Sequence, residues 1–245
     1  MKKVLITGAN KGIGFETARQ LLQNGYYVYI GSRNVENGRA AVEKLNAEGL
    51  MHVEAVKVDV TDSESVRAAR QEIGRKTDVL DVLINNAGIN GGMPQSSLEA
   101  SVDQFKRVFD TNLYGVVRVT QAFIDLLKKS PEPRIVNVSS SGSSLTLHSD
   151  PNWLYYSHKA ALYPSSKAAL NMYTIDLAYQ LRDTPFKVNA VCPGFVATDF
   201  NNHRGTGSVQ EGGTRIARYA MIGPDGPTGK FIAEEYSPKT GETPW

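Results

Sequence analysis

A tyrosine followed four residues later by a lysine occurs twice between residues 154 and 170. Tyr155 precedes Lys159, and Tyr163 precedes Lys167. On a helix, side chains four residues apart lie on one face, so an ammonium group can sit beside a phenol. Because a positive charge favours the phenolate, such a pair can do acid–base chemistry near neutral pH. The sequence therefore predicts proton transfer and leaves two candidate pairs.

Helix geometry favours the second pair. Proline lacks an N–H, which is tolerated in the first turn of a helix but not in its interior. Pro164 therefore allows a helix to begin near Tyr163 and to carry Lys167, but it would interrupt a helix that began at Tyr155. We predict that Tyr163 and Lys167 form the working pair.

Short β-branched runs alternate with longer helical patterns along the chain. The strand-like runs are apolar on both faces, which is typical of parallel strands covered by helices on both sides. This alternation predicts a single doubly wound Rossmann-type α/β domain over residues 1–245, with a central parallel sheet. The predicted strands cover residues 4–7, 27–30, 53–58, 82–85, 134–138 and 187–191, and the predicted helices cover residues 12–24, 37–47, 63–75, 98–114 and 163–182.

The first predicted strand runs into a glycine-rich turn, TGANKGIG, that opens a helix. Glycines here let the backbone approach a pyrophosphate, and the N-terminus of the helix directs free N–H groups at that anion. The G-x-x-x-G-x-G spacing differs from the usual dinucleotide fingerprint but has the same place between strand and helix. We predict a dinucleotide site that includes Gly8, Asn10, Lys11, Gly12, Ile13 and Gly14.

The end of the second strand, YIGSRN, indicates which dinucleotide to expect. An acidic residue at this place would bind a ribose 2′-hydroxyl, but the sequence has Ser32 and Arg33. Glu36 falls in the next predicted helix. Arg33 and Lys11 suit a 2′-phosphate, so NADP is the predicted cofactor. The alternative is that both are ordinary solvated charges.

Polar segments follow three further strands: NNAG ends at Gly88, NVSSS ends at Ser141, and CPGFVAT ends at Thr198. In an open parallel sheet the ligand binds beyond the carboxyl ends of the strands, so these segments should meet at one edge. Asn112, in DTNLYG, lies in a helix expected to pass beneath the same crevice.

The motifs TGANKGIG, NNAG, Asn112, IVNVSS, YPSSKAAL and PGFVAT, in this order, resemble the short-chain dehydrogenase/reductase family over nearly the whole chain. The stretch 149–163 and GPTGKF at 226–231 resemble its carbonyl-reductase-like members. The resemblance implies hydride transfer between NADP and a carbonyl or alcohol substrate, and it leaves a homodimer open.

The resemblance also implies roles for particular residues. Tyr163 would be the general acid–base group, Lys167 would lower the pKa of its phenol and bind the nicotinamide ribose, and Ser140 would donate a hydrogen bond to the substrate oxygen. Asn112 would distort its helix and anchor a water that relays protons to Lys167. Further cofactor contacts would come from Asp59, Val60, Asn86, Ala87, Gly88, Pro193, Gly194, Val196 and Thr198, the last two holding the carboxamide.

Register selects Ser140 from three consecutive serines. The second serine of the run matches the family pattern, and the two-residue period of a strand aims Ser139 and Ser141 the opposite way. The interval from Ser140 to Tyr163 is longer than in the family's compact members, which predicts an insertion over residues 147–162.

The aromatic residues Trp153, Tyr155 and Tyr156 of this insertion have two interpretations. Packing within the insertion or at an interface is favoured, and a place in the wall of a substrate pocket is the alternative. Residues 199–213, rich in glycine and asparagine, are predicted to form a substrate-side loop, with disorder as the alternative.

The 245-residue composition is 41% hydrophobic and 21% charged, with a net charge of +2, and gives no case for a nucleic-acid or membrane partner. One cysteine, Cys192, excludes an intrachain disulfide and indicates a reducing compartment. Without a signal-peptide core or membrane span, a cytoplasmic protein is expected. The four histidines do not cluster, so no metal site is predicted.

Two other functions are kept as alternatives to a small-molecule carbonyl reductase. A reductase of acyl-carrier-bound 3-keto substrates would need a basic patch for the acidic carrier, and the scattered lysines and arginines do not argue for one. A non-catalytic NADP-sensing protein would not need all of Asn112, Ser140, Tyr163 and Lys167.

Overall fold

The strands of the protein form one parallel sheet, in a computed structural model that describes residues 1–237 and 240–245. These strands are β1 (Lys3–Thr7), β2 (Tyr27–Ser32), β3 (Val53–Lys57), β4 (Val82–Asn85), β5 (Arg134–Val138), β6 (Lys187–Val191) and β7 (Lys230–Ile232). Their order is β3-β2-β1-β4-β5-β6-β7, and each neighbouring pair is parallel. The direction in which strands are added reverses between β1 and β4, and ligands bind at such a switch point.

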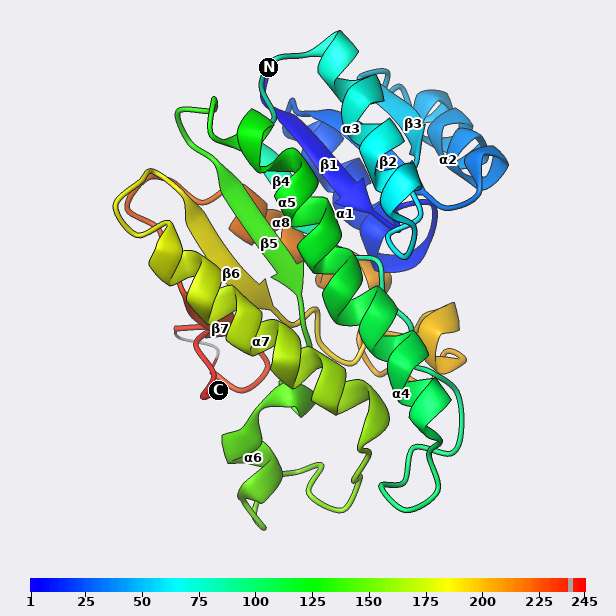
Figure 1. Cartoon of the computed structure of the whole chain (residues 1–245), viewed down its shortest axis with the longest axis vertical. Coiled ribbons are helices and arrows are strands. Elements are labelled where there is room, and N and C mark those ends of the chain that lie inside the picture. The colour runs from blue at the N-terminus through cyan, green and yellow to red at the C-terminus, as the bar shows by residue number, and fades with distance from the viewer. Residues whose placement is uncertain (238–239) are drawn as a thin grey trace.

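Helices cover both faces of this sheet. They are α1 (Gly12–Gln23), α2 (Val35–Ala47), α3 (Ser63–Lys76), α4 (Val102–Phe109), α5 (Gly115–Leu127), α6 (Leu145–Ser149), α7 (Leu162–Gln180) and α8 (Val209–Ala220). In Figure 1, α5 and α7 cross in front of the sheet, and α1 and α8 lie behind it. The core on one face takes side chains from α1, α2 and α8, and the core on the other face takes them from α3, α5 and α7. This confirms the predicted doubly wound architecture.

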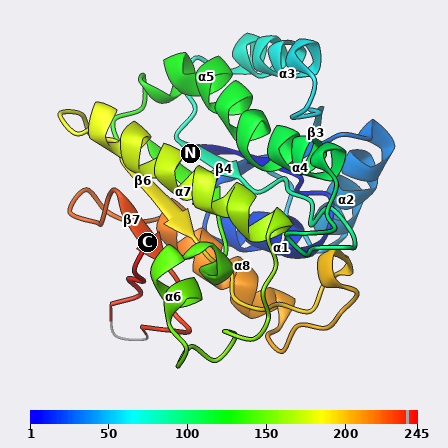
Figure 2. The same cartoon turned by 60° about the horizontal axis from the view of Figure 1, so that its bottom comes forward.

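The carboxyl ends of the strands point to the end of the molecule where the irregular segments gather. Figure 1 shows the arrowheads of β5 and β6 directed toward the end that carries α6 and the connection to α7. With that end turned forward, α6 comes into view beside the C-terminal segment (Figure 2). The molecule therefore places its loops where a doubly wound sheet binds ligands.

The helix expected over residues 98–114 begins at Val102 in the structure and continues through α5 to Leu127. Ser101 and Gln104 form a capping box: the Gln104 amide donates to Ser101 Oγ at 3.2 Å, and the Ser101 amide donates to Gln104 Oε1 at 2.9 Å. A π-helical turn over Asp110–Tyr114 then leads into α5. This turn is the local distortion expected at Asn112. The β-branched run VVRVT obscured α5 in the sequence.

The predicted loop over residues 199–213 is wrong in its second part. Residues 209–213 form the first turn of α8, because Ser208 and Glu211 form a capping box. The Ser208 amide donates to Glu211 Oε2 at 2.8 Å, and the Glu211 amide donates to Ser208 Oγ at 3.2 Å. The irregular segment after β6 therefore ends at Ser208. The three-residue strand β7 was also missed, since so short a run carries no periodicity.

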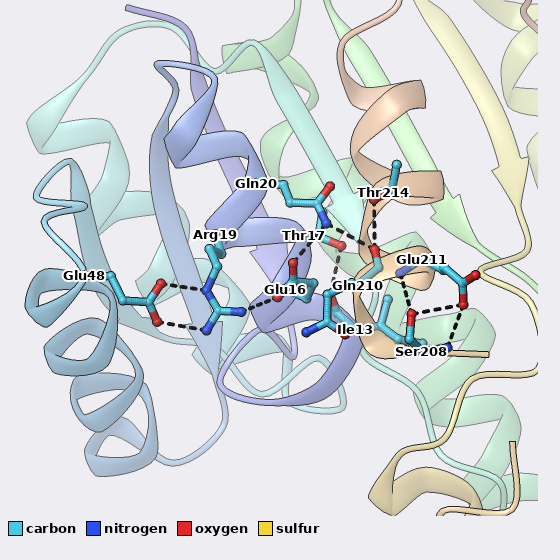
Figure 3. A network of polar contacts seen from close by, with 10 residues as sticks. All are labelled: Ile13, Glu16, Thr17, Arg19, Gln20, Glu48, Ser208, Gln210, Glu211 and Thr214. Atoms are coloured by element: carbon cyan, nitrogen blue, oxygen red, sulfur yellow. Dashed lines mark hydrogen bonds and ion pairs between the residues drawn. The ribbon is translucent and has the colours of Figure 1, made fainter. Parts of the chain in front are cut away.

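A polar network fixes α1, the helix that follows the glycine turn (Figure 3). The buried carboxylate of Glu16 pairs with Arg19 and accepts a hydrogen bond from Gln20 at 2.9 Å. Arg19 also pairs with Glu48 just beyond α2 at 2.7 Å, and Gln20 donates to the carbonyl of Gln210 in α8 at 3.1 Å. Because a buried carboxylate needs such partners, the network ties α1 to α2 and α8.

The contact between α1 and α8 requires glycine at position 213. A Cβ there would lie 2.5 Å from Glu16 Cγ and 3.2 Å from the Glu16 carbonyl carbon. We expect Gly213→Ala to lower the free energy of unfolding by about 1–3 kcal/mol through overpacking, although alanine favours helix. Urea unfolding measures the change. Gly223→Ala is the control, since its Cβ would meet no atom within 4 Å. Equal stability of the two variants would contradict this packing.

Candidate active site

A cavity of about 1010 Å³ opens at the carboxyl edge of the sheet. Its wall comes from the glycine turn after β1, from the segments after β4, β5 and β6, and from the beginning of α7. Segments far apart in the sequence therefore meet at one edge. The predicted residues that line the cavity are Gly8, Asn10, Lys11, Gly12, Ile13, Gly14, Arg33, Asp59, Val60, Asn86, Ala87, Gly88, Ser140, Tyr163, Lys167, Pro193, Gly194, Val196 and Thr198.

Ser32 is the one residue predicted at the end of β2 that does not line this cavity, and its contact with the cofactor stays a prediction. The Ser32 side chain is buried, and its hydroxyl donates to the carbonyl of Asn34 at 2.7 Å. Asn34 in turn caps α2 by accepting from the amide of Asn37 at 3.0 Å. The Ser32 hydroxyl therefore supports the turn between β2 and α2.

Asn112 lies beneath the cavity and outside its lining. Its fully buried amide accepts from the Ile89 amide, donates to the Ile89 carbonyl, and donates to Ser166 Oγ, each at 2.9 Å. Ser166 donates to the carbonyl of Tyr163 at 2.7 Å. Asn112 thus links the π-helical turn to the beginning of α7, and a water bound at Asn112 stays a prediction.

The pair Tyr163 and Lys167 lies on α7 and faces the cavity. Lys167 is 3% exposed, its Nζ donates to the carbonyl of Val138 at 2.7 Å, and it lies 5.9 Å from the centre of the Tyr163 ring. The hydrogen bond joins α7 to the end of β5. One helical turn therefore brings a phenol and an ammonium group to the same wall.

The upstream pair lies in the turns that precede α7. The Tyr155 ring packs edge-on against Trp153 at 5.6 Å between ring centres, whereas Lys159 donates to the carbonyl of His148 and lies over the Tyr156 ring at 3.8 Å. Trp153, Tyr155 and Tyr156 are all absent from the described lining of the cavity. Packing within this segment, the favoured interpretation, agrees with the structure.

The three serines after β5 point in different directions. Ser140 faces Tyr163 across the cavity wall. The hydroxyl of Ser139 donates to Asn171 Oδ1 at 2.7 Å, and that of Ser141 donates to Glu235 Oε1 at 3.1 Å. Ser139 also lines the cavity, but its hydroxyl is bound to Asn171, and the assignment of Ser140 stays a prediction.

Burial governs the protonation of the two groups on α7. It raises the pKa of the Tyr163 phenol above its usual value, with Cys192 adding to the rise and a hydrogen bond with Ser140 opposing it. Burial lowers the pKa of Lys167 to about 8. Burial outweighs any lowering of the phenol pKa by Lys167, whose ammonium group donates to the Val138 carbonyl. Tyr163 is therefore a protonated acid at neutral pH, and Lys167 keeps its charge below about pH 8.

The glycine turn forms a cradle that side chains would fill. Gly8 has a φ of +65°, and a Cβ there would lie 2.9 Å from Ala87 Cα. At Gly14 a Cβ would lie 2.5 Å from Asn86 Nδ2 and 2.8 Å from the Gly8 carbonyl. Within residues 1–237 and 240–245, no side chain caps the N-terminus of α1, so its first amides are open to an anion. The turn fits the pyrophosphate of a dinucleotide.

Two predicted cations, Lys11 and Arg33, line the cavity. Lys11 Nζ lies 2.9 Å from Asp199 Oδ2, in an ion pair that is weak because both side chains are solvent-exposed. Arg33 is exposed at the end of β2 and has no ion pair in the described part of the chain. Glu36, the acidic alternative, instead pairs with Arg39 at 2.7 Å. The position of Arg33 directly after β2 fits a phosphate on the ribose next to that strand.

Sequence reasoning did not single out two aromatic residues of the lining, Phe195 and Phe200. The Phe200 ring packs edge-on against Tyr163, with 5.3 Å between ring centres. Asn90 holds this segment by donating to the Phe200 carbonyl at 2.5 Å. The sequence signal that could have identified Phe200 is its apolar side chain within residues 199–213, which were predicted to face the substrate.

A model of the family described as short chain dehydrogenase matches residues 2–208. The chain belongs to the short-chain dehydrogenase/reductase family of oxidoreductases. The short-chain dehydrogenase anuI of Penicillium roqueforti is 36% identical to it over 239 residues, covering 95% of this chain and 94% of that relative. Members of the family are enzymes that act on small molecules.

Two solved short-chain dehydrogenase/reductase structures are similar along their whole length. Salutaridine reductase from Papaver somniferum has a TM-score of 0.83 and 31% identity, covering 94% of this chain and 99% of its own. The NADPH-bound carbonyl reductase from chicken fatty liver has a TM-score of 0.85 and 28% identity, covering 100% and 99%. Both neighbours are named as reductases.

None of the helices within residues 1–237 and 240–245 is long and apolar enough to cross a membrane. Among the same residues, no three side chains of His, Cys, Asp or Glu gather as a metal site.

Proposed function

We propose that this short-chain dehydrogenase/reductase is an NADP-dependent carbonyl reductase that interconverts a small-molecule carbonyl compound and its alcohol. The observation that carries the proposal is the wall of one cavity, where a protonated Tyr163 and a charged Lys167 lie together with the glycine cradle after β1. A dinucleotide in the cradle and a carbonyl group beside the phenol would share this space.

The chemistry divides between the cofactor and the residues of the chain. Reduced nicotinamide, when bound, supplies the hydride that the carbonyl carbon receives. Tyr163 gives its proton to the carbonyl oxygen, which completes the alcohol. Ser140 donates a hydrogen bond to the same oxygen, where negative charge grows. Lys167 stabilises the phenolate that remains on Tyr163, and we also assign it the predicted hydrogen bond to the nicotinamide ribose.

Preference for the phosphorylated cofactor rests on Arg33 and Lys11. Both are cations on the cavity wall. Glu36 is the first acidic residue after β2, and its carboxylate is paired with Arg39. The chicken carbonyl reductase, solved with NADPH, supports the same choice by similarity.

Arg33→Ala is expected to raise the KM for NADPH by about tenfold to a hundredfold, because a charge-assisted hydrogen bond contributes about 1.5–3 kcal/mol. The KM for NADH, which lacks the 2′-phosphate, should stay unchanged. Lys57→Ala is the control, because Lys57 is an exposed cation at the end of the neighbouring strand β3 and does not line the cavity. An equal loss with both cofactors would contradict the role of Arg33.

The test of the function is oxidation of NADPH and of NADH, in parallel, against a panel of ketones and aldehydes. We expect carbonyl-dependent oxidation with NADPH. Binding of NADPH without turnover on any carbonyl compound would favour the non-catalytic sensor. Activity confined to carrier-bound 3-keto substrates would favour the carrier-dependent reductase, and activity with NADH alone would contradict the assignment of Arg33 and Lys11.

Three expectations remain predictions beside this proposal. They are the insertion over residues 147–162, a homodimer, and a cytoplasmic location. Size-exclusion chromatography with light scattering tests the second directly.

A further inference from the structure

Helix α7 carries a third polar side chain in line with its tyrosine and lysine. Asn171 follows Lys167 by four residues, as Lys167 follows Tyr163, so the three lie on one face of the helix. Asn171 is 4% exposed and lies under the segment that carries Ser140. An amide buried at this depth must have partners.

The hydrogen-bond partners of Asn171 are Ser139, directly before Ser140, and Ser143, three residues after it. Ser139 Oγ donates to Asn171 Oδ1 at 2.7 Å, and Asn171 Nδ2 donates to Ser143 Oγ at 2.8 Å. Ser143 Oγ then donates to the carbonyl of Ser140 at 2.5 Å, and the Ser143 amide donates to the same carbonyl at 2.8 Å. The chain of donors therefore runs in one direction and ends on the backbone of Ser140.

Within this chain Asn171 both accepts and donates. The hydroxyl of Ser143 has one proton, which the Ser140 carbonyl receives, so its oxygen accepts from Asn171 Nδ2 at 2.8 Å and has Ser139 Oγ as a further neighbour at 3.2 Å. An apolar side chain at position 171 would leave Ser139 and Ser143 without this partner in a buried place. The 3-10 turn Ser141–Ser143 would then lose its link to α7.

We infer that Asn171 and Ser143 are positioning residues for Ser140. Through them α7 sets the place of the hydroxyl that binds the substrate oxygen, while the same helix carries the proton donor Tyr163 and its partner Lys167. The inference rests on the proposed function. Misplacement of a catalytic group by about 1 Å can lower the rate about a hundredfold. A single helix that fixes Ser140, Tyr163 and Lys167 relative to one another would avoid this loss.

A double-mutant cycle on carbonyl reduction tests the inference. Ser140→Ala is expected to lower kcat about a hundredfold or more, as loss of a donor to the developing oxyanion does. Ser143→Ala and Asn171→Ala should each lower kcat about tenfold when Ser140 is present, and by less than about twofold in the Ser140→Ala background. The Kd for NADPH should not change. Additive losses in the two backgrounds would overturn the inference.

Thr174→Val is the matched control for a purely structural effect. Thr174 is a buried residue of the same helix, and its hydroxyl donates to the Leu170 carbonyl at 2.8 Å and accepts from Asn137 at 2.9 Å. Neither of these hydrogen bonds involves the turn Ser141–Ser143. We expect Thr174→Val to lower the melting temperature as Ser143→Ala does and to leave kcat unchanged. An equal loss of kcat in both would overturn the inference.

A crystal structure of the Ser143→Ala variant gives a readout that does not depend on turnover. The turn Ser141–Ser143 should shift, and the Ser140 hydroxyl should move away from the Tyr163 phenol. An unchanged Ser140 would overturn the inference. If the wild-type protein reduced no carbonyl compound, the proposed function would fail, and this structure would still decide whether Ser143 positions Ser140.

Discussion

Replacement of Tyr163 by phenylalanine is expected to lower kcat for carbonyl reduction by about a thousandfold, within the range that a general acid contributes. The variant lacks the proton that the carbonyl oxygen must receive, while its ring still packs against Phe200. The Kd for NADPH should therefore stay within about twofold of wild type. Steady-state rates and fluorescence titration with NADPH measure the two quantities.

Tyr155→Phe is the matched control for this replacement. Tyr155 begins the other Tyr-x-x-x-Lys pattern, but its ring packs against Trp153 in the segment before α7. We expect kcat of Tyr155→Phe to equal that of wild type. A large loss in Tyr155→Phe, with near-normal turnover in Tyr163→Phe, would mean that the wrong pair has been assigned.

The charge on Lys167 is expected to set the alkaline limit of the reaction. Burial lowers its pKa to about 8, so the ammonium group is present below this pH and is lost as the pH rises through it. Burial raises the pKa of Tyr163, which keeps the proton donor protonated over the same range. We therefore expect kcat for carbonyl reduction to fall above about pH 8, measured as a pH–rate profile.

Two substitutions assign this limit to Lys167. Lys167→Met removes the charge and should lower kcat by about a hundredfold or more, leaving a profile without the break near pH 8. Lys167→Arg keeps a charge at every accessible pH, because a guanidinium group does not deprotonate in proteins, so its residual activity should also lack the break. A break near pH 8 that persisted in Lys167→Met would belong to another group.

The sequence was sufficient for strands β1 to β6 and for the beginning of α7 near Tyr163. Buried parallel strands have continuous apolar runs, and Pro164 marks the beginning of a helix by its own geometry. Both features are local, so neighbouring residues determine them. The capping boxes at Ser101 and Ser208 are equally local, and they could have corrected the ends of α4 and the predicted loop over residues 199–213.

The protonation of the site could not be predicted from the sequence. Spacing indicates that Lys167 lies one turn from Tyr163, but it says nothing of the Val138 carbonyl that binds the ammonium group. Depth of burial, which sets the direction of both pKa shifts, comes from segments distant in the chain. The sequence likewise gives no sign of the hydrogen bond from the Ser32 hydroxyl to the Asn34 carbonyl.

The role of Asn171 could be inferred only from its hydrogen bonds to residues distant in the chain. A polar residue four positions after Lys167 is visible in the sequence, but its partners Ser139 and Ser143 lie 32 and 28 residues away. Only the packing of α7 against the turn after β5 brings them together. The sequence signal for Asn171 is the four-residue spacing that it shares with Tyr163 and Lys167.

Isotope transfer tests the central claim, which is that a hydride passes from the nicotinamide to a carbonyl carbon. The protein is incubated with NADPH that carries deuterium at the transferable position and with a ketone that it reduces, and the product alcohol is analysed by mass spectrometry and NMR. We predict one deuterium on the carbon that was the carbonyl carbon. Product alcohol with solvent hydrogen at that carbon would contradict the account.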